Sequence, residues 1–293
     1  MSTIALMILG FGLADAPVAP FSSLRARIET LAARSGGRLG VAIELLETRE
    51  SLHVGGEQHM PMHSVYKLPI AMAVLNQTDR GVLRVDQSIR VEAAAFLPPG
   101  WHSPIRDQFP KGADLSVREL VRYMVSESDG SACDVLLGVL GGPEKVMDFL
   151  SGIGVDGIQV VSTERAMSSD DQMQYRNWAS PRGMLSLLRA LHASRGLSAS
   201  SRTLLLKDLT ESTPGAHRLK ALLPGGAAVA HKTGTGRRGA LWSATNDVGI
   251  VTLPNGQHLA IAVLLMDSTA DEATREGTIA AVAKAAWETF ASR

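Results

Sequence analysis

The strongest strand-forming segments of this chain lie near its two ends, with a mostly helical middle of about 150 residues between them. Residues 39–46 and 51–54 are predicted strands that follow a helix over residues 21–33. Three β-rich segments and a closing amphipathic helix are predicted near the other end, over residues 227–235, 243–253, 259–266 and 270–290. We therefore expect an α/β (α+β) fold, with an antiparallel sheet made from both ends of the chain and an all-helical subdomain.

No repeat or low-complexity linker separates these parts. We expect a single domain over residues 20–293. Its α/β part comprises residues 20–62 and 212–293, and its helical part comprises residues 63–211.

Two segments of the middle are informative. Ser116 is a clear helix start, since Glu119 three residues later completes a capping box. Residues 159–177 are polar and irregular, and a loop of that length inside a compact domain is usually functional.

Composition and charge exclude several classes of function. The chain has 29 Lys and Arg residues against 29 Asp and Glu residues and no basic block, so neither nucleic acid nor an anionic membrane is an expected partner. Its single cysteine, Cys133, lies in an apolar run and is expected in the core. The eight histidines are scattered, without a metal-binding spacing, so we expect no metal site and no cofactor.

The first residues resemble an export signal. Residues 4–13 are apolar but too short to span a bilayer, and small residues follow. No Lys or Arg precedes the apolar run, which is atypical of such signals. We expect residues 1–19 to be an export signal or a disordered N-terminus, no membrane span, and a periplasmic or secreted protein.

The pair Ser64 and Lys67 is the first candidate for chemistry. The three-residue spacing at a helix start puts both side chains on one face. A serine hydroxyl is a poor nucleophile until a neighbouring group takes its proton, and a lysine amine does so only when its pKa is lowered. A helix cap followed by a solvated lysine is the ordinary alternative, so the interpretation depends on other groups.

Three further signals follow along the chain. They are Ser128 in the sequence Ser-Asp-Gly, Glu164 in the irregular segment, and the run Lys232-Thr233-Gly234-Thr235 on a predicted strand. Each has an ordinary interpretation alone: a turn, a solvated carboxylate, a charged edge strand. Together, and in this order, they form a recognised active-site set for acyl transfer.

The set resembles that of a class A serine β-lactamase, and nearly the whole chain after residue 20 is similar to that family. Several stretches resemble its PER/VEB-like extended-spectrum branch: SVYKLPIAM at 64–72, ACD at 132–134, DDQMQYRNW at 170–178, RLK at 218–220 and HKTGT at 231–235. The resemblance implies a β-lactamase/transpeptidase-like fold with a five-stranded sheet flanked by terminal helices. It also implies a monomer that hydrolyses small-molecule β-lactam antibiotics, cephalosporins included, through a serine acyl-enzyme.

The resemblance assigns catalytic roles. Ser64 attacks the lactam, its proton goes to Lys67 or through a water to Glu164, and Glu164 is the base for deacylation. Ser128 relays a proton to the lactam nitrogen, and Lys232 keeps the cleft positive.

It also implies the binding groups. The backbone N–H groups of Ser64 and Thr235 form an oxyanion hole. Thr233 and Thr235 bind the substrate carboxylate, and Gly234 lets the substrate lie close to the strand. Arg218 anchors that carboxylate or lies at the surface, and Trp101 forms a wall of the cleft or packs within its loop.

Several positions depart from the family pattern. Gly130 stands where most class A enzymes have an asparagine, and Ser168 replaces the asparagine that helps place the water. An Arg–Asp ion pair usually closes the loop that carries the glutamate, but here Ser162 and Asn177 stand at its ends. We expect an altered substrate preference and a differently folded or wider loop, which favours bulky oxyimino-cephalosporins.

Two other functions stay open at this point. A penicillin-binding carboxypeptidase or esterase shares the serine, the lysine and the Lys-Thr-Gly run, but holds its acyl-enzyme for long times. A non-catalytic β-lactam sensor keeps the fold alone. Glu164 argues against both, because a carboxylate that orients water releases the acyl group.

Overall fold

The computed structural model describes residues 20–291 of the chain. The export signal expected at residues 1–19 lies outside the described residues. Within residues 20–291, no helix combines the length and the apolar character needed to cross a membrane.

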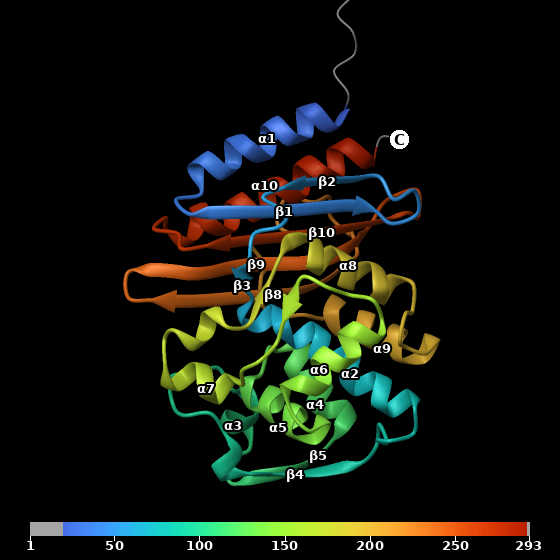
Figure 1. Cartoon of the computed structure of the whole chain (residues 1–293), viewed down its shortest axis with the longest axis vertical. Coiled ribbons are helices and arrows are strands. Elements are labelled where there is room, and N and C mark those ends of the chain that lie inside the picture. The colour runs from blue at the N-terminus through green and yellow to red at the C-terminus, as the bar shows by residue number, and fades with distance from the viewer. Residues whose placement is uncertain (1–19, 292–293) are drawn as a thin grey trace, which may run out of the picture.

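A five-stranded antiparallel sheet forms the framework, in the order β2-β1-β10-β9-β8 (Figure 1). Its strands are β1 (Arg38–Leu45), β2 (Ser51–Val54), β8 (Val229–Arg238), β9 (Leu241–Thr252) and β10 (His258–Met266). The first and last strands of the chain pair along their lengths, from Arg38 opposite Met266 to Leu45 opposite Leu259. The prediction of a sheet built from both ends of the chain is confirmed.

Alternating side chains direct the two faces of the sheet into two separate cores. In β10, Leu259, Ile261 and Val263 join one apolar cluster, which also contains residues of α1 (Pro20–Arg34) and α10 (Glu272–Phe290). The intervening residues, such as Ala260 and Ala262, join the cluster on the other face, where the helical part packs. The sheet therefore lies between the two terminal helices above and the helical part below (Figure 1).

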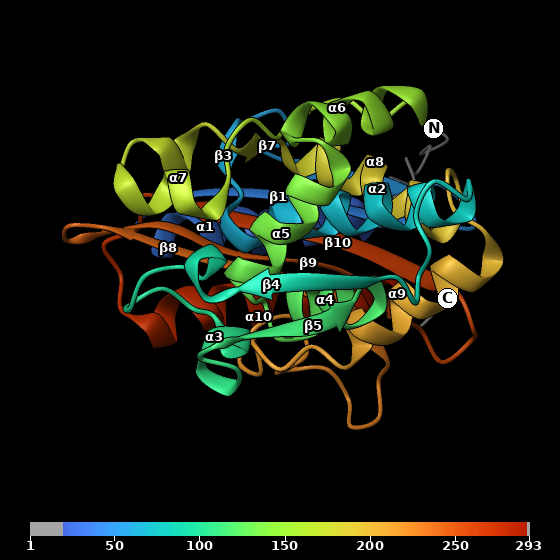
Figure 2. The same cartoon turned by 90° about the horizontal axis from the view of Figure 1, so that it is seen from below.

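The helical part lies in front of the sheet when the molecule is seen from below (Figure 2). Its α-helices are α2 (Lys67–Asp79), α3 (Pro104–Gln108), α4 (Val117–Ser126), α5 (Gly130–Leu140), α6 (Pro143–Gly152), α7 (Glu164–Ser169), α8 (Pro181–His192) and α9 (Ala199–Thr210). Its 3₁₀ turns are η1 (His63–Tyr66), η2 (Ala93–Ala95) and η3 (Met173–Tyr175). Helix α8 packs on β1 and β10, which joins this part to the sheet.

The helical part also contains strands, so the expectation of an all-helical subdomain is incomplete. Strands β4 (Ser88–Glu92) and β5 (Gly112–Ser116) pair with each other, and β3 (Met60–Pro61), β7 (Trp178–Ala179) and β6 (Ile158–Gln159) form a second small sheet. Strands β3, β6 and β7 have two residues each, too few to show an alternating pattern in the sequence.

The capping box predicted at Ser116 is present. The Ser116 hydroxyl accepts a hydrogen bond from the Glu119 backbone N–H, and the Glu119 carboxylate accepts one from the Ser116 N–H at 2.7 Å. Helix α4 therefore begins with two of its free N–H groups satisfied.

We expect Ser116→Ala to lower the free energy of unfolding by about 1 kcal/mol, because the start of α4 loses its side-chain acceptor. Urea unfolding of both proteins measures the difference. Ser116→Thr keeps the hydroxyl and is the control, which should retain most of the stability; an equal loss in both variants would contradict a capping role.

Candidate active site

A cleft of about 450 Å³ opens where the sheet meets the helical part. It is lined by residues from η1 and α2, the 100–102 loop, the turn before α5, the segment from α7 to η3, and β8: His63, Ser64, Lys67, Gly100, Trp101, His102, Ser128, Glu164, Met167, Asp171, Gln174, Pro214, Thr233, Thr235, Gly236 and Arg237. Segments far apart in the sequence thus meet at one cavity.

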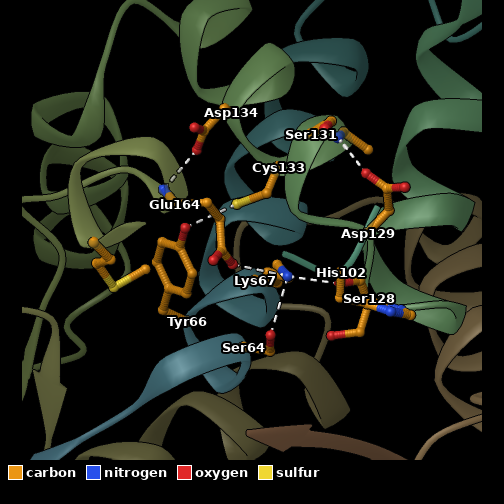
Figure 3. Close-up of polar contacts among 12 residues, drawn as sticks. Ser64, Tyr66, Lys67, His102, Ser128, Asp129, Ser131, Cys133, Asp134 and Glu164 are labelled. Carbon is orange, nitrogen blue, oxygen red and sulfur yellow. Dashed lines mark hydrogen bonds and ion pairs between the residues drawn. The ribbon is translucent and has the colours of Figure 1, made fainter. Parts of the chain in front are cut away.

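Ser64 and Lys67 face each other across one turn (Figure 3). The Lys67 ammonium donates to the Ser64 hydroxyl at 3.0 Å and to the Ser128 carbonyl at 2.7 Å. Ser64 lies in the 3₁₀ turn η1, and Lys67 is the first residue of α2, so the serine precedes the α-helix rather than opening it. Only 1% of Lys67 is exposed, so its charge requires a partner inside the protein.

Glu164 supplies that partner. Its carboxylate lies 2.8 Å from the Lys67 Nζ. The segment expected to be irregular forms a short helix here, α7, which begins at Glu164. The Asp134 carboxylate of α5 accepts hydrogen bonds from the backbone N–H groups of Glu164 at 2.7 Å and Arg165 at 2.9 Å. This contact fixes the start of α7, and with it Glu164, against α5 (Figure 3).

The ion pair sets the protonation of Lys67. Burial is the largest single effect and lowers the pKa of Lys67, but the surrounding groups, led by the Glu164 carboxylate, together outweigh it, and the net pKa is raised. Both the Ser64 hydroxyl and the Glu164 carboxylate contact the same nitrogen, so their oxygens lie at most about 6 Å apart, a gap that one water can bridge.

Ser128 is held by Lys67, which lines the cleft, and by Lys232, which is fully buried and does not line it. Its carbonyl accepts from Lys67, and its hydroxyl accepts from the Lys232 ammonium at 2.9 Å. Its φ is +60°, a strained conformation for a residue other than glycine. The Asp129 carboxylate stabilises this turn by accepting from the backbone N–H groups of Ile105 and Ala132, each at 2.7 Å.

Lys232 is the second cation at the site, and like Lys67 it is buried. Burial, together with the Lys67 ammonium, lowers the pKa of Lys232 to about 7. An anionic group entering the cleft would raise that pKa, because it stabilises the charged form.

Along β8, alternate residues face opposite sides. Thr233 and Thr235 line the cleft, whereas Gly234 does not. A Cβ atom on Gly234 would lie 2.3 Å from the Met62 carbonyl oxygen, next to η1. The glycine is therefore required for packing of the strand against η1, and this differs from the expectation that it admits a substrate.

Arg218 is buried and does not line the cleft. Its guanidinium donates to the Thr235 hydroxyl at 2.7 Å and to the Gly234 carbonyl at 3.1 Å, and it pairs with Glu276 at 2.9 Å. Arg218 is therefore neither at the surface nor exposed to the cleft, which were the two expectations. It orients the Thr235 hydroxyl through a hydrogen bond.

Trp101, Gly130 and Ser168 are the remaining residues predicted to bind substrate, and only one of them lines the cleft. Trp101 lines the cleft, as expected for a wall residue, but Gly130 and Ser168 do not. The Ser168 hydroxyl donates to the Arg165 carbonyl within α7, which turns it away from Glu164. A Cβ atom on Gly130 would lie 2.4 Å from a methyl group of Leu97, so that side chain occupies the space a larger residue needs.

The segment around α7 is closed by an amide instead of an ion pair. The Asn177 side chain accepts from the backbone N–H groups of Val161 at 2.8 Å and Ser162 at 3.0 Å, and it donates to the Ser162 carbonyl at 2.9 Å. Asn177 is fully buried. Three hydrogen bonds therefore hold the two ends of the segment together.

Some residues of the site were not predicted from the sequence. His63, Gln174 and Ser243 form a hydrogen-bonded group, of which His63 and Gln174 line the cleft. Asp134 holds α7, and Arg237 lines the cleft beyond Thr235.

The sequence offered a partial signal for some of them. Asp134 and Gln174 lie in stretches that resemble the extended-spectrum branch, and His63 precedes Ser64. Their contacts come from tertiary structure, so the sequence assigned them no role.

Comparison with known proteins supplies an independent observation. Residues 23–290 match the beta-lactamase enzyme family. The chain is 38% identical to beta-lactamase VEB-1 of Pseudomonas aeruginosa over 92% of this chain and 91% of that protein. It is 40% identical to extended-spectrum beta-lactamase PER-1 of the same organism, over 90% and 86% of the two chains. The crystal structure of the TLA-1 extended-spectrum beta-lactamase superposes with a TM-score of 0.90 at 38% identity, over 93% of this chain and 99% of that chain.

We expect Asn177→Ala to lower the free energy of unfolding by about 1–3 kcal/mol, because a buried N–H group and a carbonyl lose their partner. In this variant, the hydrogen-exchange rate of the backbone amides should also increase more in α7 than in β10. Asn76→Ala, which removes a hydrogen bond to the Gly196 carbonyl, is the control and should leave exchange in α7 unchanged. Unchanged α7 exchange in Asn177→Ala would contradict the closing role.

The lowered pKa of Lys232 predicts a pH-dependent stability. Between about pH 7 and its ordinary pKa of 10.5, the unfolded chain binds a proton that the folded chain does not, so this contribution to stability rises with pH. Lys232→Met should therefore gain more stability over the wild type at about pH 6 than at about pH 9. A difference independent of pH, measured by urea unfolding, would show that Lys232 keeps an ordinary pKa.

Proposed function

The chain belongs to the beta-lactamase enzyme family and hydrolyses β-lactams as a class A serine enzyme; we propose that Ser64 is its nucleophile and that Glu164 releases the acyl group. The observation that carries this proposal is the position of the Glu164 carboxylate, 2.8 Å from Lys67 and within one-water reach of Ser64. The family supports hydrolysis over the carboxypeptidase, esterase and sensor alternatives.

Acylation begins with attack of the Ser64 oxygen on the lactam carbonyl carbon. Lys67 already carries a proton, so it cannot accept another, and the Ser64 proton ends on Glu164. A bridging water delivers it, or Lys67 first passes its own proton to Glu164 and then takes the one from Ser64. The backbone N–H groups of Ser64 and Thr235 stabilise the oxyanion that forms.

Ring opening requires a proton for the departing nitrogen. The Ser128 hydroxyl is the donor, because the Lys232 ammonium holds its oxygen at 2.9 Å and both ends of the residue are fixed. The C–N bond of the lactam breaks as this proton transfers, and an ester on Ser64 remains. The proton held by Glu164 then passes through Lys67, which contacts both residues, to Ser128. Glu164 therefore enters deacylation as a carboxylate and Ser128 as a hydroxyl.

Deacylation completes the turnover. Glu164 takes a proton from a water that attacks the ester carbonyl. The Ser64 oxygen leaves with the proton that Glu164 returns through Lys67, so both groups regain their resting states. Glu164 is only 6% exposed, and Asp134 fixes the backbone from which it extends, so its carboxylate is positioned before the water binds.

The substrate carboxylate binds at the Lys232, Thr233 and Thr235 side chains. Arg218 acts indirectly, since its guanidinium orients the Thr235 hydroxyl. Trp101 also lines the cleft. We extend the proposed substrates to bulky cephalosporins, because the similar PER-1 is an extended-spectrum beta-lactamase and the cleft measures about 450 Å³.

We also propose that residues 20–293 act as a single, monomeric domain and that the protein is exported to the periplasm or secreted. Support comes from its similarity to VEB-1 and PER-1 along almost the entire chain.

Replacing the base should separate the two half-reactions. We expect Glu164→Gln to lower kcat for a chromogenic cephalosporin by ~10²–10⁴-fold, because the attacking water loses its proton acceptor. An acyl-enzyme should accumulate and be detected by intact-protein mass spectrometry.

Glu211→Gln removes an exposed carboxylate and is the control, which should turn over like the wild type. Steady turnover of Glu164→Gln at the wild-type rate, or a persistent acyl-enzyme on the wild type, would refute the assignment of Glu164.

A further inference from the structure

Three side chains with metal-binding groups meet at the end of the sheet away from the cleft. Glu47 lies in the turn between β1 and β2, His192 is the last residue of α8, and His258 is the first residue of β10. Each can offer one ligand atom such that all three atoms lie within 4.8 Å of one another, and within residues 20–291 this is the one such group of three.

Contacts between the three side chains are already short. The His258 Nδ1 lies 2.8 Å from a Glu47 carboxylate oxygen, and the His192 Nε2 lies 3.8 Å from the same oxygen. The two imidazole rings lie 4.6 Å apart between centroids. Between 24% and 34% of each side chain is exposed, so an ion can reach the group from solvent.

We propose that Glu47, His192 and His258 bind a divalent transition-metal ion of the zinc type, with water in the remaining position. Two imidazole nitrogens and one carboxylate oxygen form a ligand set that zinc uses in proteins, with bonds of about 2.0–2.2 Å. Ligand atoms of a tetrahedral site then lie about 3.3–3.5 Å apart. The observed separations fall on both sides of that value, so small side-chain rotations complete the site.

The backbone holds two of the ligands in place without an ion. The His258 N–H donates to the Glu47 carboxylate at 2.9 Å, and the His258 carbonyl accepts from the Leu46 N–H at 2.9 Å. His192 comes from the helical part, so an ion at this point links α8 to the sheet. Preformed geometry of this kind lowers the ordering cost of binding.

The site is independent of the catalytic cleft. His258 pairs with Thr252 of β9, whereas Thr233 of the cleft pairs with Asp247, five positions along the same strand or about 17 Å away. We therefore expect the ion to affect stability and not the chemistry at Ser64. Arg202 lines the small cavity beside the two rings, and its positive charge weakens the binding of a cation.

Calorimetric titration of untagged protein with Zn²⁺ tests the proposal. We expect one Zn²⁺ bound per chain at micromolar affinity, and no comparable binding of Mg²⁺, which prefers oxygen ligands. His192→Gln and His258→Gln should each weaken Zn²⁺ binding by at least about tenfold. His217→Gln, which replaces an exposed histidine outside the group, should bind like the wild type.

Each variant is also assayed for hydrolysis of a chromogenic cephalosporin without added metal, and equal rates establish that all remain folded. Substituting Co²⁺ should give a visible absorption band in the wild type that His258→Gln lacks. The proposal is overturned if Zn²⁺ binds wild type and His258→Gln equally, if Mg²⁺ competes equally, or if no saturable binding occurs. None of these outcomes depends on the role of Glu164.

Discussion

The buried ammonium of Lys67 is the charge around which the cleft is arranged. An isolated charge in a protein interior costs many kcal/mol, so its partners must come from within the protein. Lys67 finds them on three segments: the Ser64 hydroxyl, the Ser128 carbonyl and the Glu164 carboxylate. One cation thereby connects the proposed nucleophile, the proposed proton donor and the proposed base, and the nearby Glu164 carboxylate helps to raise its pKa.

A second buried cation makes the cleft suited to an anionic ligand. Burial, and after it the nearby Lys67 ammonium, lowers the pKa of Lys232. In the proposed binding mode, a substrate carboxylate at Thr233 and Thr235 would offset both effects and favour the charged form of Lys232. The Lys232 ammonium also donates to the Ser128 hydroxyl, so the same cation would serve binding and the proposed proton donor.

The sequence predicted the features that depend on short-range residue patterns, namely the regular secondary structure and the catalytic motifs. Alternation and period predicted the strands of the main sheet and the two terminal helices, and the motifs at Ser64, Ser128 and Lys232–Thr235 supplied groups that meet at the cleft. Contacts between segments that are distant in the sequence could not be predicted from these patterns. The role of Gly234 depends on how closely η1 approaches, and the loop closure by Asn177 depends on backbone groups. The three proposed metal ligands, Glu47, His192 and His258, are far apart in the sequence and meet only in the folded chain.

The protonation of Lys67 decides whether the resting cleft works as described, because it determines which group receives the Ser64 proton. NMR titration of the Lys67 side chain, labelled with ¹³C at Cε and assigned by comparison with Lys67→Arg, measures it directly. We predict a charged Lys67 whose pKa is raised above 10.5 in the wild type and falls when Glu164 is replaced by glutamine. A neutral Lys67 amine at neutral pH in the unliganded enzyme would contradict the account.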